Sequence, residues 1–117
     1  MFKGGTNMMT KMQFACEVMK AHSKIEGVRK MLDTDEYHLM SLYVETDKKK
    51  DIIESVVEGM SYEITNRILG NGYDQGILKT VVKNNVSMLL SKTVCDWFAI
   101  NETLKILEAS CVVFKED

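Results

Sequence analysis

The sequence predicts an all-α fold, a compact bundle of about five helices that leaves room for a short C-terminal strand. Amphipathic patterns with a helical period recur along most of the chain. Proline is absent from all 117 residues, which favours long helices joined by few, short connections. Hydrophobic residues make up 45% and charged residues 27%, as in ordinary soluble globular proteins. This length fits one domain, which we place at residues 10–117 after a flexible N-terminus at residues 1–9.

Residues 10–32 carry the first helical pattern, and Thr10 is suited to cap it. Apolar side chains alternate at intervals of four and three residues over nearly three heptads. They are Phe14, Val18, Ala21, Ile25, Val28 and Leu32. The helix either packs inside its own domain or pairs with a second copy, and the first five of these residues are the candidate self-association surface of a possible homodimer. Three heptads is the lower limit for a free coiled coil, which favours packing inside the domain.

The next two segments also predict helices. Asp33 and Glu36 have the spacing of a capping box and predict a short helix at residues 34–45, although residues 37–44 also fit a strand. The clearest helix spans residues 47–69, with one continuous apolar face. That face comprises Ile52, Ile53, Val56, Val57, Met60, Ile64 and Ile68. On its flank, Glu63 and Arg67 are spaced to form an ion pair across one helical turn.

The stretch LGNGYDQGIL, residues 69–78, holds three glycines within seven positions. A phosphate-binding loop follows a strand, whereas an amphipathic helix precedes this stretch. The lysine and hydroxyl residues of a nucleotide-binding loop are missing as well. We therefore expect a turn between two antiparallel helices, with Gly70 as the C-cap of the first. Asp74 is expected to cap the second helix, and Gly76 to lie in its first turn.

Part of this stretch, NGYDQGILKTVV, resembles the first homology region of the Bcl-2 family, where a D/N-G pair and a second glycine open the central helix. The matching positions are Asn71, Gly72, Asp74, Gly76, Leu78 and Val82. Gln75 stands where that family usually has tryptophan, and Ile77 where it usually has arginine. The resemblance covers about a tenth of the chain. It implies an all-α bundle with a peptide-binding groove.

The second half of the chain predicts a helix at residues 75–91 and another that starts near residue 101. The first has an apolar side formed by Ile77, Leu78, Val81, Val82, Val86, Met88 and Leu89. Asn85 falls in the middle of that side, where we expect its amide to find hydrogen-bond partners. Asn101 is expected to cap the last helix. Residues 94–100 fit a strand or a short helix, and residues 111–116 fit a helix or a strand.

Several chemistries are not expected. The net charge of −2 gives no global field that would recruit nucleic acid or an anionic membrane. No run of about 18 uncharged apolar residues predicts a transmembrane helix, so we expect no membrane partner. Three widely spaced cysteines indicate reduced thiols and a cytoplasmic location. His22 and His38 are the only histidines, and neither lies in a zinc-binding spacing, so no metal, cofactor or catalytic residue is expected.

We therefore expect a non-enzymatic helical module that binds another protein, of the adaptor or inhibitor type, with a Bcl-2-like groove binder as one form. Large side chains away from the predicted core faces are the candidate partner contacts. They are Tyr62, Leu69, Tyr73 and Trp97. Core packing is the alternative role for Trp97.

The second hypothesis is a small DNA-binding regulator in which residues 92–110 form a helix-turn-helix, with AIN at residues 99–101 as the turn. The recognition helix of this motif would present Glu102 and Glu108 to the DNA, and Lys105 would be its one lysine. Phosphate contacts dominate DNA affinity, so nucleic acid is the less favoured partner.

Overall fold

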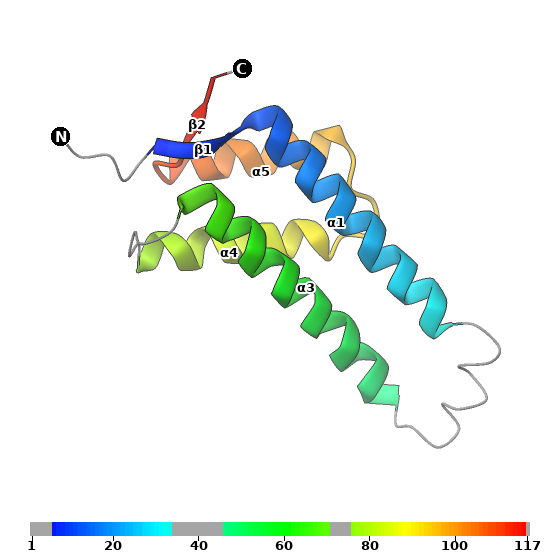
Figure 1. Cartoon of the computed structure of the whole chain (residues 1–117). Coiled ribbons are helices and arrows are strands. Elements are labelled where there is room, and N and C mark those ends of the chain that lie inside the picture. Colours follow the sequence, from blue (N-terminus) through cyan, green and yellow to red (C-terminus); the bar gives the residue numbers. More distant parts are fainter. Residues whose placement is uncertain (1–5, 34–45, 71–75, 117) are drawn as a thin grey trace.

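A computed structural model describes residues 6–33, 46–70 and 76–116. Four helices and two short strands occur in these ranges (Figure 1). In chain order they are β1 (Thr6–Thr10), α1 (Lys11–Leu32), α3 (Thr46–Leu69), α4 (Ile77–Leu90), α5 (Trp97–Ala109) and β2 (Val113–Lys115). The predicted helical bundle is confirmed, with four described helices where five were expected. The helix predicted at residues 34–45 lies outside the described residues. None of the described helices is long and apolar enough to cross a bilayer.

Helix α1 begins at the predicted cap. The Thr10 hydroxyl accepts a hydrogen bond from the Gln13 amide at 3.0 Å, and the Gln13 side chain accepts one from the Thr10 amide at 2.9 Å. This reciprocal pair fixes the point at which the chain turns from β1 into the helix. Asp33 lies at the other end, where it is the C-cap of α1.

The apolar seam of α1 packs inside the domain. Four of its five candidate self-association residues, Phe14, Val18, Ala21 and Ile25, are buried in the common core, and Val28 is half-buried. Helix α1 packs against α3, α4 and α5 in the same chain. The seam is therefore not available to a second copy, and the prediction of a homodimer surface on these residues is wrong.

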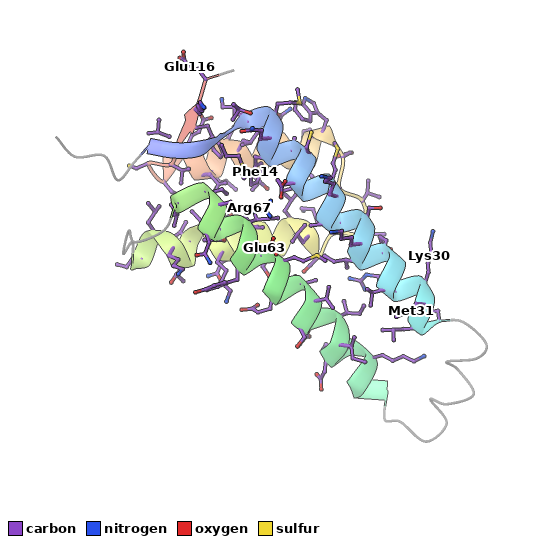
Figure 2. The ribbon with its side chains drawn as sticks, viewed as in Figure 1. Phe14, Lys30, Met31, Glu63, Arg67 and Glu116 are labelled. Carbon is purple, nitrogen blue, oxygen red and sulfur yellow. The ribbon has the colours of Figure 1, made fainter. Side chains whose placement is uncertain are left out.

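Helix α3 runs antiparallel to α1 and packs most extensively against α4 (Figure 1). Val57, Ile64 and Ile68 on its predicted apolar face are buried. Arg67 donates a hydrogen bond to Glu63 at 2.9 Å, as predicted (Figure 2). It also pairs with Glu17 of α1. These ion pairs are partly exposed, so each contributes little to stability. The pair between Arg67 and Glu17 joins α3 to α1.

Gly70 ends α3 as predicted. Its φ of +79° lies in the left-handed region, and its amide donates to the Asn66 carbonyl at 2.8 Å. The next helix begins at Ile77, with Gly76 as its N-cap at a φ of +50°. Gly76 therefore precedes the first turn of α4, where the sequence had suggested that it would lie inside it. The cap predicted at Asp74 lies outside the described residues.

Helix α4 buries one side only in part as predicted. Val82, Val86, Leu89 and Leu90 are fully buried. Ile77 and Met88, assigned to the same side, are 83% and 67% exposed. Ile77 lies at the outer end of the helix, and Met88 lies about 100° around the helix from its buried neighbour Leu89. Asn85 is half-buried, and its amide donates to the Val81 carbonyl at 2.8 Å, so its expected hydrogen bond is made within its own helix.

Helix α5 starts earlier than predicted. The Asp96 carboxylate accepts a hydrogen bond from the Ala99 amide at 2.9 Å, which makes Asp96 the N-cap, and the prediction of Asn101 as the cap is wrong. The helix is continuous through residues 99–101. The turn that the helix-turn-helix hypothesis places there is therefore absent from residues 92–110.

The two strands form a small parallel sheet that joins the ends of the chain. Thr6 pairs with Val113 and Thr10 with Lys115, with an irregularity between them. The C-terminal strand option is thus confirmed, whereas residues 6–9, expected to be flexible, form most of β1. Phe114 of β2 packs edge-to-face on Phe14 of α1, with ring centroids 5.7 Å apart, which attaches the sheet to the core.

Candidate protein interface

The four candidate partner contacts do not form one site. Tyr62 and Trp97 are 48% and 47% exposed, and they lie on different helices. Leu69 is buried in the core, because α3 packs against β1 as well as against α1 and α4; its prediction as a partner contact is wrong. Tyr73 lies outside the described residues. The half-exposed indole also rules out full core packing for Trp97.

Tyr62 has a basic neighbour. The Lys79 ammonium lies 4.7 Å from the centre of the Tyr62 ring and donates a hydrogen bond to its hydroxyl at 3.3 Å. This hydrogen bond and the charge of Lys79 lower the pKa of the Tyr62 phenol below its usual value. The contact joins α3 to α4 across the surface. One end of the Tyr62 side chain is thus already engaged by a charge of its own chain.

Trp97, in contrast, belongs to a cluster of exposed apolar side chains. Val94 is 65% exposed and Phe98 is 74% exposed, next to the half-exposed Trp97. Val94 lies in the connection between α4 and α5, and the two aromatic residues form the start of α5. We call these three residues the α5 patch. Large apolar side chains are unusual at such exposure in a group, since they would be stabilised by removal from water.

The position of Phe98 on the helix explains why its side chain faces outward. The inward side of α5 is occupied by Ile100, Thr103, Leu104 and Leu107. Phe98 precedes Ile100 by two residues, which places it about 200° around the helix from the core. Asp96 fixes the start of the helix through its hydrogen bond to Ala99. The register that buries the core residues of α5 therefore leaves Phe98 in solvent.

The connection that carries Val94 is held in place by α1. The His22 side chain donates a hydrogen bond from Nε2 to the Lys92 carbonyl at 2.7 Å. Cys95, between Val94 and Asp96, turns toward the core and is half-buried. Burial and the nearby Asp96 carboxylate raise the pKa of the Cys95 thiol. The α5 patch thus rests on a connection fixed at both ends, which lowers the entropy lost when such a surface binds.

A second surface feature is a groove of about 570 Å³ between α1 and α3, which the last turn of α4 also lines. Its apolar lining comes from Leu32, Ile53 and Val57. Its charged lining residues include both signs, with Lys50 and Glu54 paired at 4.0 Å. None of the described lining residues belongs to the stretch that resembles the Bcl-2 family. This groove is therefore not the peptide-binding groove that the resemblance to the Bcl-2 family implies.

The described residues include no group of three side chains that could hold a metal ion. Sequence reasoning named Trp97 and missed Val94 and Phe98; the exposure of Phe98 follows from a helix that already begins after Asp96. An aspartate followed directly by two aromatic residues was the available signal. Comparisons of the chain with protein-family models, curated proteins and solved structures found no match.

Proposed function

We propose that this chain is a non-enzymatic interaction module that binds another protein through the α5 patch. The observation that carries the proposal is the joint exposure of Val94, Trp97 and Phe98 at one end of α5. Tryptophan and other large aromatic side chains dominate the binding energy of protein interfaces, typically as a compact central cluster. The three residues supply such a cluster, on a rigid support.

Tyr62 is a weaker second contact. Its ring already contacts Lys79, so a partner would have to displace or include that lysine. The groove between α1 and α3 supports the narrower idea of a peptide-groove binder less well, because its charges are largely paired within the chain. The DNA-binding alternative is less favoured, because α5 is continuous where the helix-turn-helix motif requires a turn.

A photo-crosslinking experiment tests the proposed function. A photoreactive amino acid replaces Val94, and the full chain is irradiated in an extract of its native host. The expected result is a discrete covalent adduct whose partner, identified by mass spectrometry and purified, binds the parent chain saturably. Phe98→Ser should weaken that binding by about tenfold or more, because truncating an aromatic side chain at the centre of an interface typically costs about 2 kcal/mol of binding free energy.

The control places the same photoreactive residue at Ile77, which is 83% exposed at the far end of α4. Adducts common to positions 94 and 77 reflect exposure alone. If every adduct is common to both positions, or if the purified partner binds Phe98→Ser as well as it binds the parent, the proposed function is wrong.

A further inference from the structure

A carboxylate lies inside the α5 patch. Asp96 stands between Val94 and Trp97 in the chain and is exposed. Its backbone is extended, with a φ of −100° and a ψ of 179°, and neighbouring side chains of an extended chain point to opposite sides. Cys95 packs against the core, so Val94 and Asp96 both face the solvent. A molecule that covers Val94 and the two aromatic residues therefore covers Asp96 as well.

The Asp96 carboxylate is only partly satisfied by its own chain. One oxygen, Oδ1, accepts the hydrogen bond from the Ala99 amide that caps α5. Over residues 6–33, 46–70 and 76–116, no other group donates to this carboxylate and no cation pairs with it. The N-terminal end of a helix compensates about half of a unit charge. The rest of the negative charge of Asp96 is stabilised by water.

The neighbouring charged side chains do not supply the missing partner. The Glu102 carboxylate lies further along α5 and is already paired with Lys105 at 3.3 Å. Lys92 is exposed and lines a shallow hollow over α4 together with Met88. Removing an ionised carboxylate from water without a partner costs free energy that the apolar contacts would first have to offset. The occupant of the α5 patch therefore has to bring a cation to Asp96.

An arginine suits this position better than a lysine. Its planar guanidinium donates two parallel hydrogen bonds to a carboxylate, whereas a lysine ammonium acts as a point charge. A guanidinium also stacks on an indole ring, and Trp97 directly follows Asp96 in the chain. The residues beside the arginine have to be apolar, because Val94 and Phe98, on either side of this pair in the chain, are 65% and 74% exposed.

We propose, resting on the function proposed above, that the α5 patch binds a segment of another protein in which an arginine lies between large apolar side chains, with its guanidinium paired to Asp96. The apolar contacts provide affinity, and the carboxylate selects the arginine. A segment without a cation at this place is disfavoured, since its binding would leave Asp96 covered and unpaired. The α5 patch thus discriminates against acidic segments and against wholly apolar ones.

A library of random peptides displayed on phage tests the pairing. Peptides are selected on the folded parent chain after depletion on Phe98→Ser, which removes peptides that bind elsewhere on the surface. The expected consensus is an arginine beside large apolar residues. A selected peptide is then synthesised with arginine and with citrulline, which has nearly the same shape but no charge. Isothermal titration calorimetry measures the dissociation constant of each form.

Asp96→Asn removes the charge and keeps the cap, because asparagine and aspartate are equally good N-cap residues. This substitution and the citrulline replacement should each weaken binding by about tenfold, since each breaks a desolvated charge pair. The two changes together should cost little more than either alone, which is the signature of a direct contact. Glu102→Gln is the matched control. It should bind the peptide like the parent, because Glu102 is already paired within its own chain.

The proposed pairing is wrong if no selected peptide depends on Phe98, if the selected peptides lack arginine, or if citrulline binds as well as arginine. It is also wrong if a folded Asp96→Asn, checked by circular dichroism, binds like the parent, or if the losses from the two changes simply add. A Phe98-dependent adduct at position 94 whose binding Asp96→Asn leaves unchanged would refute the arginine pairing and leave the proposed function standing. The absence of any such adduct would remove both.

Discussion

Replacing Gly70 with alanine tests the helix end that the sequence and the structure agree on. Gly70 has a φ of +79°, and apart from its chain neighbours no atom of the described residues lies within 4 Å of the position that an added Cβ would take. The expected cost is therefore that of the left-handed backbone, about 1–2 kcal/mol for a residue with a Cβ. The reduced freedom of the unfolded chain returns about 0.5 kcal/mol. The net loss of stability is about 1 kcal/mol, or about 4 °C in melting temperature for a domain of this size.

Gly59→Ala is the matched substitution with the opposite expected sign. Gly59 lies inside α3, its φ is not positive, and an added Cβ meets no atom of the described residues within 4 Å outside the backbone of its own helix. Alanine should therefore stabilise the helix by about 1 kcal/mol. Thermal unfolding followed by circular dichroism measures both variants against the parent. If the two variants shift the melting temperature in the same direction, Gly70 is not a left-handed cap and the reasoning is refuted.

Three further perturbations probe the core and the surface. Val57→Asp should unfold the domain or nearly so, because an unpaired buried carboxylate costs several kcal/mol, while exposed Glu54→Ala should melt like the parent. Ser61→Ala should melt at the parent temperature or higher, since the buried Ser61 hydroxyl has no hydrogen-bond partner in the described structure; a drop of several degrees would reveal one. Lys79→Met should raise the pKa of the Tyr62 phenol, because the ammonium stabilises the phenolate. An ultraviolet titration against pH measures this pKa, and Tyr62→Phe identifies which part of the tyrosine signal belongs to Tyr62. A Tyr62 titration midpoint that is the same in Lys79→Met as in the parent would contradict the prediction.

Local signals in the sequence predicted the long helices well. The spacing of apolar residues located α1 and α3 to within a residue or two, since their buried faces follow the helical period. Thr10 and Gly70 marked the two helix ends correctly, because a cap depends on only a few neighbouring residues. The Glu63–Arg67 pair followed from its spacing for the same reason.

Features that depend on distant contacts were not predictable. Strand β1 has the sequence TNMMT, and it is ordered by pairing with β2 at the other end of the chain. The covering of α3 by β1 also explains the error at Leu69, which a single apolar stripe could not place in the core. A short strand in a two-stranded sheet has little signal of its own.

The interface was predictable only in part. Asp96 and Asn101 are both good N-cap residues, and the choice between them decides whether residues 97–100 belong to the last helix. In the structure Asp96 is the N-cap, so Phe98 lies in the first turn of the helix, where it is exposed. Trp97 was named as a candidate, but the patch around it depends on that choice of cap.

The central claim is that the α5 patch is exposed in the free chain and covered when the chain binds its partner. Trp97 is the only tryptophan, so its fluorescence reports on this surface without further labelling. The free, dilute protein should show the red-shifted emission of a solvent-exposed indole, readily quenched by acrylamide. The emission should move to the blue and quenching should fall as the partner covers the patch. An indole that is already shielded from acrylamide in the dilute protein, or one whose emission and quenching stay the same when the partner is bound, would contradict the account.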